Sequence, residues 1–141
     1  MVSVNPYLAF DGRCEEAFDL CRSVFGGEFA NVSRYSEMPP DSGVPAEHGD
    51  KIMHMALTLG DGFEIMGSDR PPGWGQTTFG DSVSVMVSPA SADEGRRIFE
   101  ALASDGQVTM PYERQFWGDD YGQVKDRFGI NWQINYHPPQ S

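Results

Sequence analysis

The chain has 141 residues, of which 39% are hydrophobic and 12% aromatic, so it can form one domain with its own core and is too apolar for a disordered protein. Its formal net charge of −11 argues against a nucleic-acid groove or an anionic membrane surface as partner, because both need clustered Lys and Arg. No apolar run approaches the ~20 residues of a membrane span.

The first predicted elements are a strand over residues 2–10, which alternate in polarity, and a helix over residues 11–27. Asp11 is expected to cap the start of the helix, and Gly26 and Gly27 to end it. The helix is indicated by apolar residues that recur every three or four positions, namely Cys14, Ala17, Phe18, Cys21, Val24 and Phe25.

The two cysteines of the chain, Cys14 and Cys21, both fall on this helix. At about 1.5 Å of rise per residue their Cα atoms lie roughly 10 Å apart, which is beyond the reach of a disulfide. Free thiols suit a reducing compartment, and the N-terminal segment has no basic region followed by a long apolar core. We therefore expect a cytoplasmic protein without a signal peptide.

A second strand, a long loop and a hairpin are predicted next. The strand covers residues 28–36, and the three prolines of residues 37–50 indicate a loop or a mobile flap. Residues 51–69 form a predicted hairpin that turns at Gly60-Asp61-Gly62. A linker over residues 70–80 completes the first half.

The second half repeats this order of elements. A strand over residues 81–88 precedes a helix over residues 91–106, which has a Ser91/Glu94 capping box and Gly106 as its stop. Three further strands are predicted over residues 107–116, 120–126 and 130–137.

The chain is thus predicted to be an α+β protein in which a βαβββ module occurs twice within a single domain of residues 1–141. Module one covers residues 1–69, the linker residues 70–80, and module two residues 81–137. Each helix is expected to cover the outer face of a curved mixed sheet, because burial of apolar area is worth about 25 cal/mol per Å². The strand positions expected to face the helices are Val4, Leu8, Phe10, Met53, Met55, Leu57, Leu59, Phe63, Ile65, Val83, Val85, Val87, Ile130, Trp132, Ile134 and Tyr136.

The opposite face of every strand is semi-polar rather than charged, so these faces are expected to line a cleft for a ligand. Amide groups and aromatic rings on such a face can orient or stack on a small molecule. The candidate ligand-binding residues are Tyr7, His54, Met66, Ser84, Trp117, Gln133 and Asn135.

At this point the sequence resembles the vicinal-oxygen-chelate superfamily, which contains glyoxalase, bleomycin-resistance proteins and extradiol dioxygenases. The resemblance is strongest to the PhnB-like branch, sometimes called a demethylubiquinone methyltransferase. It rests on the segments "PYLAFDGRCEEAFDLCRSVFGGE", "KIMHMALTLGDG", "FEALASDGQVTMP" and "FWGDDYGQVKDRFGINWQIN". It implies paired modules, a shared concave sheet and a homodimer. No Gly-rich strand–turn–helix loop supports the methyltransferase label.

Enzymes of this superfamily hold a divalent metal with His, Gln or Glu on the first and last strands of the modules. The positions that correspond here are Asn5 or Tyr7, Met66 or Glu64, Ser84, and Gln133. Only Gln133 and Glu64 are credible ligands, since Ser, Met, Asn and Tyr make a poor set for Zn²⁺, Ni²⁺ or Fe²⁺. The resemblance therefore implies an incomplete metal site and no evident cofactor.

His54 is the candidate general base or metal ligand, because it titrates near neutral pH. The alternative is a histidine that hydrogen-bonds Ser68 or a carbonyl of the flap. The expected hairpin register puts Glu64 opposite residue 58, too far along the strands to share a metal with His54.

Other polar side chains are assigned to turns or to the surface. Asp126 is expected to accept backbone N–H groups in the turn at Phe128-Gly129. Asp119 and Asp120 belong to the preceding turn and point apart. Two more histidines, His48 and His137, are expected in the flap and at a solvated end, and His48 is also a candidate to close over a ligand.

The leading hypothesis is a homodimer that binds a small organic molecule in a concave cleft without a complete metal site. The alternative is a metal-dependent lyase, isomerase or dioxygenase of the glyoxalase kind, which would use a divalent metal held by His54, Glu64 and Gln133. A structural dimer with a filled cleft is a third possibility. The sequence alone does not decide whether the protein is an enzyme.

Overall fold

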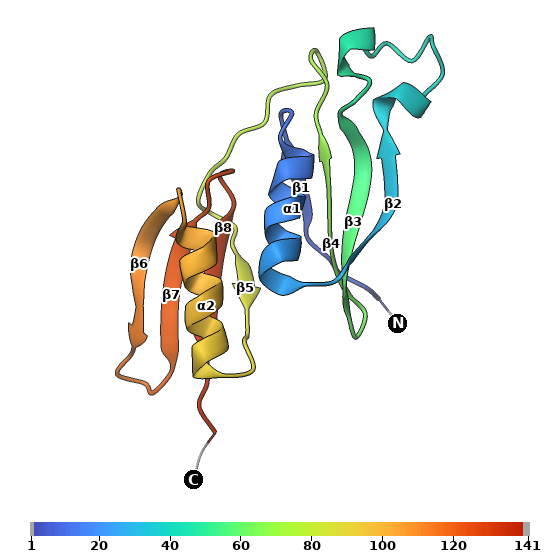
Figure 1. Ribbon diagram of the computed structural model, residues 1–141. Coiled ribbons are helices and arrows are strands. Elements are labelled where there is room, and N and C mark those ends of the chain that lie inside the picture. Colours follow the sequence, from blue (N-terminus) through green and yellow to red (C-terminus); the bar gives the residue numbers. More distant parts are fainter. Residues whose placement is uncertain (1, 140–141) are drawn as a thin grey trace. The chain divides into compact units, whose positions relative to one another are not determined.

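The computed structural model describes residues 2–139 and divides into two compact units, Met1–Thr78 and Phe79–Ser141. Each unit contains one four-stranded sheet and one α-helix, so the predicted duplication of a βαβββ order is confirmed (Figure 1). Across residues 2–139 neither α-helix exceeds 12 residues, and none is long and apolar enough to cross a bilayer.

The sheet of the first unit has the order β1-β4-β3-β2. Strand β1 runs parallel to β4, and the other neighbours are antiparallel. The elements are β1 (Tyr7–Phe10), α1 (Cys14–Phe25), β2 (Glu28–Arg34), β3 (Ile52–Gly60) and β4 (Phe63–Asp69), with two 3₁₀ turns at η1 (Tyr35–Glu37) and η2 (Ala46–His48).

The second unit has the corresponding order β5-β8-β7-β6, again with one parallel pair, β5 with β8. The antiparallel pairs are β6 with β7 and β7 with β8. The elements are β5 (Val85–Val87), α2 (Ala92–Ala103), β6 (Gln107–Arg114), β7 (Asp120–Lys125) and β8 (Asn131–Tyr136).

Helix α1 covers one face of the first sheet, as Figure 1 shows. The predicted helical stripe is buried apart from Phe25, which is partly buried. On the sheet side Met55 and Leu57 are buried, and Gly67 lies so close to the helix that a Cβ atom there would stand 2.7 Å from the Phe18 ring. The same helix buries Cys14 and Cys21, and no disulfide joins them, as predicted.

Helix α2 covers the second sheet in the same way (Figure 1). Trp132 and Ile134 of β8 are buried, so the predicted inward face of this strand is confirmed. The start of α2 has the predicted cap, in which the Ser91 hydroxyl accepts the Glu94 N–H at 3.1 Å. The Glu94 carboxylate accepts the N–H of Ala90 at 3.2 Å, one residue before the position that a capping box requires.

A buried aspartate at the end of β4 supplies the cap of α1. Asp69 is 3% exposed, and its Oδ1 accepts the backbone N–H groups of Gly12 and Cys14, both at 2.9 Å. Its Oδ2 accepts the N–H of Ile52 at 3.0 Å. The prediction that Asp11 caps this helix is wrong, because a carboxylate from a distant strand already occupies the first free N–H groups.

Asp126 has the comparable role in the second unit, and the predicted turn is confirmed. Its Oδ1 accepts the N–H groups of Phe128 and Ile130 at 2.9 and 3.1 Å. Its Oδ2 accepts the indole N–H of Trp132 at 2.8 Å. The carboxylate therefore ties the β7–β8 turn to the largest core side chain of this unit.

The predicted first strand of each module is too long. Strand β1 begins at Tyr7 rather than residue 2, and β5 covers only three residues of the predicted 81–88. Phe63, also expected to face the helix, is exposed as the first residue of β4, directly after the hairpin turn. The expected helix-facing residues Val4 and Val83 are exposed because they lie outside the paired strands, with Val83 at 77%. The reason is that a sheet face extends only as far as the neighbouring strand pairs, and β5 pairs with β8 only from Val85 to Val87.

Candidate functional site

The face of the first sheet that does not carry α1 holds a hydrogen-bonded Tyr7–His54 pair. The Tyr7 hydroxyl lies 3.1 Å from His54 Nδ1, and the two rings stack with centroids 5.6 Å apart. Tyr7 is half exposed, and His54 is partly exposed. The partner of His54 is therefore a phenol rather than the expected Ser68 or flap carbonyl, and both polar groups stay within reach of solvent.

Met66 lies beside this pair in the row of residues across the sheet. Strand register places Met66 opposite Tyr7 on one side and Ala56 on the other. Glu64 is opposite Thr58, as the predicted hairpin register requires. Positions 54 and 58 of β3 are about 13 Å apart at 3.3–3.4 Å per residue, so strand geometry separates Glu64 from His54.

The helix-free face of the second sheet carries a chain of three polar side chains. The Tyr121 hydroxyl donates to Gln133 Oε1 at 2.9 Å and accepts from the Gln123 amide at 2.8 Å. Gln133 is opposite Gln123 on one side and Met86 on the other. Gln133 was predicted on this face, whereas Tyr121 and Gln123 were not. The alternation of β7, in which Gly122 and Val124 are buried, is the signal that places both of them here.

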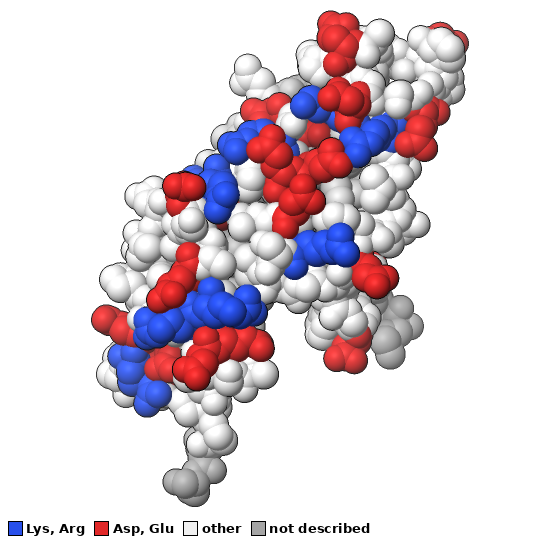
Figure 2. Space-filling model, viewed as in Figure 1, with Lys and Arg blue, Asp and Glu red and all other residues white. Residues whose placement is uncertain are grey.

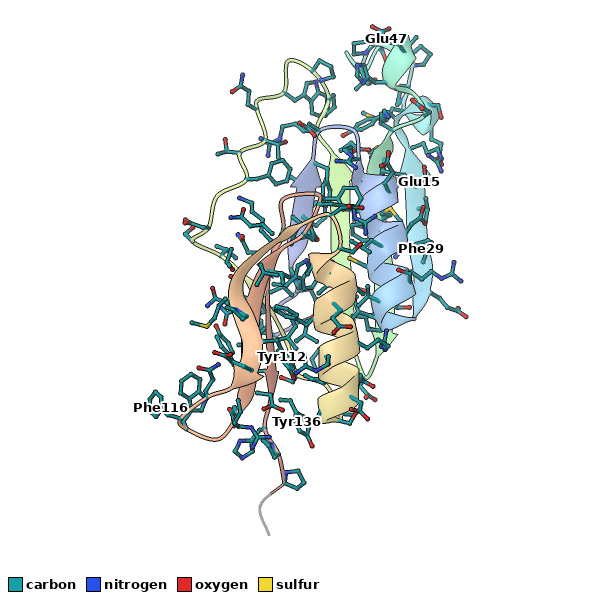
Figure 3. The ribbon with its side chains drawn as sticks, turned by 60° about the vertical axis from the view of Figure 1, so that its left-hand side comes forward. Glu15, Phe29, Glu47, Tyr112, Phe116 and Tyr136 are labelled. Carbon is teal, nitrogen blue, oxygen red and sulfur yellow. The ribbon has the colours of Figure 1, made fainter. Side chains whose placement is uncertain are left out.

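Trp117 lies in the turn between β6 and β7, where it contacts two other aromatic rings. Its ring centroid is 4.9 Å from that of Phe116 and 6.2 Å from that of Tyr121. Phe116 is 98% exposed, and Figure 3 shows it projecting from the tip of this turn. The Trp117 ring thus adjoins the Tyr121–Gln133–Gln123 chain while half of its surface faces solvent.

Asn135 is held by an aspartate rather than left free on the sheet. Its amide donates to Asp119 Oδ2 at 3.0 Å, and His137 Nδ1 contacts the other oxygen of the same carboxylate. These two contacts, His137 first, lower the pKa of Asp119. His137 was expected to be solvated; it is exposed, and it also forms an ion pair with Asp119. The neighbouring Asp120 forms an ion pair with Arg114.

Two other predicted positions lie at the margins of these faces. Ser84 is partly buried and precedes β5, so it is outside the paired strand. Asn5 precedes β1 and donates a hydrogen bond to the Ser3 hydroxyl at 2.9 Å.

The residues proposed as weak metal ligands do not form a set within either unit. Between residues 2 and 139, no three His, Cys, Asp or Glu side chains are grouped in a way that could hold a metal ion. His54 and Glu64 belong to the first unit and are separated along its strands, and Gln133 is in the second unit, bonded to Tyr121.

A hollow of about 370 Å³ that was not predicted from the sequence lies at one end of the first unit. It is called the Lys51 pocket below. Its walls come from the β1–α1 turn, the η1 and η2 turns, the end of β4 and the loop after β4. The lining residues are Asp11, Gly12, Tyr35, His48, Lys51, Asp69, Arg70, Pro71, Pro72, Gly75, Gln76 and Thr77. His48 of the predicted flap is thus placed on the wall of a pocket.

Charged side chains do not single out a large interaction surface on the face that Figure 2 shows. Lys and Arg lie among Asp and Glu there rather than in a patch of their own.

Comparison with known proteins identifies relatives over nearly the whole chain. Residues 2–135 match the family model described as 3-demethylubiquinone-9 3-methyltransferase. Protein YjdN of Escherichia coli K12 is 31% identical over 140 residues, which cover 94% of this chain and 93% of that protein.

Solved structures agree with these matches. Protein PA1353 from Pseudomonas aeruginosa superposes with a TM-score of 0.86 at 34% identity, covering 97% of this chain and 98% of the other. A putative 3-demethylubiquinone-9 3-methyltransferase, the PhnB protein from Bacillus cereus, gives 0.78 at 27% identity, covering 96% and 99%. A glyoxalase-related enzyme from Fulvimarina pelagi gives 0.62 at 16% identity, covering 99% and 94%, a likeness of fold alone.

These matches confirm the predicted fold class, an α+β glyoxalase-like fold of two modules. They also confirm the resemblance drawn from the sequence. The chain therefore belongs to the PhnB-like family, whose model is described as 3-demethylubiquinone-9 3-methyltransferase.

Proposed function

We propose that this protein binds small organic molecules on the helix-free face of each sheet, through Tyr7 and His54 in the first unit and through Gln133 in the second. One observation supports the proposal above the others. Each sheet carries, on the face away from its helix, a partly exposed polar group built around a tyrosine hydroxyl. Such side chains are fixed by their mutual hydrogen bonds and remain accessible from solvent, so they can hold a ligand in one orientation.

The apolar side chains next to these polar groups favour contact with an organic ligand over contact with water. Met66 adjoins Tyr7, and Met86 and Met110 lie in the same row as Gln133 and Gln123. Met86 is 53% exposed. Methionine adapts its shape to a partner, and a mixture of thioethers with a few fixed polar groups is typical of small-molecule sites.

The expected homodimer is the second part of the proposal. It is supported by large apolar side chains that are exposed in the single chain, among them Val4, Phe63, Val83 and Phe116. A dimer interface would cover those of these side chains that lie together, because monomeric soluble proteins rarely expose a large contiguous apolar patch. Sedimentation equilibrium is expected to give twice the 15.6 kDa of one chain. A mass of one chain at micromolar concentration would contradict the dimer.

Ligand binding is tested by screening a library of small carboxylic acids, phenols and amides with ligand-detected NMR. We expect at least one compound to bind, and His54→Ala or Gln133→Ala to weaken its binding about tenfold, the effect of one lost hydrogen bond near 1.4 kcal/mol. Tyr7→Phe removes the hydroxyl alone and is expected to act in the same direction as His54→Ala.

The control is Glu100→Ala, which removes an exposed side chain of α2, the helix that covers the opposite face of the second sheet, and is expected to leave the affinity unchanged. Binding that none of the site variants weakens would refute the proposal. Calorimetric titration with Zn²⁺, Ni²⁺ and Mn²⁺ tests the metal-dependent alternative. If one metal ion binds per chain and His54→Ala or Gln133→Ala abolishes this binding, the metal-dependent enzyme replaces metal-free ligand binding as the function.

A further inference from the structure

We propose that the Lys51 pocket is a second binding site, distinct from the sheet faces, and that it takes a small organic anion with a carboxylate or phosphate group. The pocket belongs wholly to the first unit, since all its lining residues precede Phe79. Its volume of about 370 Å³ is within the range of sites for small molecules, roughly 300–1,000 Å³.

The basic groups of the pocket are not neutralised by ion pairs. Lys51 Nζ donates to the carbonyl of Gly12 at 3.2 Å, and Arg70 donates to the carbonyl of Gln76 at 2.6 Å. Within residues 2–139 neither side chain forms a salt bridge, in a chain with 21 acidic and 10 basic residues. Two cations that face one hollow and bond only to neutral carbonyls retain N–H groups for an anion.

A hydroxyl of the same wall has no partner in the structure. Thr77 Oγ1 is buried from solvent and, within the described chain, makes no hydrogen bond, although Thr77 lines the pocket. Burying a hydroxyl without a partner costs about 1–3 kcal/mol. Because this oxygen has no solvent-exposed surface, a ligand in the pocket could bond it only after the Thr77 side chain turns toward the hollow.

The acidic residues of the pocket oppose an anion less than their number suggests. The Asp69 oxygens already accept three backbone N–H groups, one of them from Cys14 at the start of α1, where the helix dipole favours negative charge. Asp11 is exposed, so solvent screens it. His48 and Gln76 add further donors to the wall.

A neighbouring hollow limits the affinity that Lys51 can provide. It has a volume of about 190 Å³, and Lys51 shares it with acidic side chains that include Glu15, Asp19 and Asp50. Because these carboxylates compete for the ammonium group, we expect a dissociation constant on the order of 1 mM for a simple oxyanion.

The test is a titration of the full chain with inorganic phosphate and, separately, with malonate, at constant ionic strength set by sodium chloride. Binding is followed by the amide NMR signals of Gly12, Gln76 and Thr77. Both probes are expected to shift these signals, and the tighter of the two shows whether a phosphate or a carboxylate is preferred. Lys51→Gln and Arg70→Gln are each expected to weaken binding about tenfold.

The matched control is Arg127→Gln, which removes an exposed arginine of the second unit with the same change in charge. It is expected to bind both probes like the parent chain. The unchanged amide spectrum of each variant shows that it is folded.

The proposal is overturned if neither probe shifts the three signals beyond the effect of sodium chloride. It is also overturned if Lys51→Gln and Arg70→Gln bind like Arg127→Gln. Loss of the Lys51 pocket as a site would leave the Tyr7–His54 and Gln133 proposal untouched, because those side chains do not line the pocket.

Discussion

Replacing Asp69 with alanine is expected to lower the free energy of unfolding by about 3–5 kcal/mol, because three backbone N–H groups lose their acceptor at once. These groups belong to Gly12 in the β1–α1 turn, to Cys14 at the start of α1 and to Ile52 at the start of β3. Asp69→Asn keeps only one acceptor oxygen and is expected to lose about half as much. Urea unfolding followed by circular dichroism measures both changes.

The control for Asp69 is Asp81→Ala, which removes an exposed aspartate from a segment outside any helix or strand. It is expected to change the stability by less than about 0.5 kcal/mol. If Asp69→Ala unfolds at nearly the urea concentration of Asp81→Ala, the carboxylate does not hold the helix, the strand and the turn together.

Adding a methyl group at Gly122 or Gly67 is expected to destabilise the protein by about 2–4 kcal/mol, because both glycines allow a helix to lie directly on a sheet. A Cβ atom at Gly122 would stand 2.7 Å from Tyr112 Cα and 2.8 Å from the Phe99 ring. At Gly67 it would stand 2.8 Å from the backbone oxygen of Leu8. Since backbone atoms are part of both contacts, a side-chain rotation alone does not relieve them.

Gly80→Ala is the control for these two substitutions, because a Cβ atom there meets nothing within 4 Å and the backbone is not left-handed. It is expected to be neutral or to stabilise by up to about 1 kcal/mol through the unfolded chain. Thermal unfolding of the three alanine variants measures the difference. Similar melting temperatures for all three would show that the helices do not depend on these glycines.

Periodicity was sufficient to predict which side of a strand faces a helix. In β8 the alternation separates buried Trp132 and Ile134 from Gln133 and Asn135, as observed. The same rule failed at Val83, because alternation says which way a side chain points but not whether a neighbouring strand continues beside it. Pairing partners are set by the whole sheet and cannot be inferred from one strand.

Local turn chemistry was predictable where the partners are close in sequence. Asp126 accepts N–H groups two and four residues ahead, which is a pattern that aspartate commonly forms in turns. Asp69 accepts N–H groups from residues 17 to 57 positions away, so no local rule identifies it. For the same reason Asp11 was a reasonable but wrong choice of cap.

The Lys51 pocket could not be predicted because loops form most of it. Arg70, Gln76 and Thr77 lie in a segment with neither helical nor strand periodicity, which the sequence identifies only as a linker. The Tyr7–His54 pair is intermediate between these cases. Alternation placed both residues on one face, but their hydrogen bond depends on the register of β1, β4 and β3.

The most direct measurement of ligand binding on the helix-free faces uses methionine methyl groups as NMR probes. Met66 and Met86 report on these faces, whereas buried Met55 reports on the core beneath α1. A compound that binds as proposed will shift the methyl signal of Met66, of Met86 or of both, and leave Met55 unchanged. A bound compound that shifts Met55 but neither of the other two would contradict the proposed site.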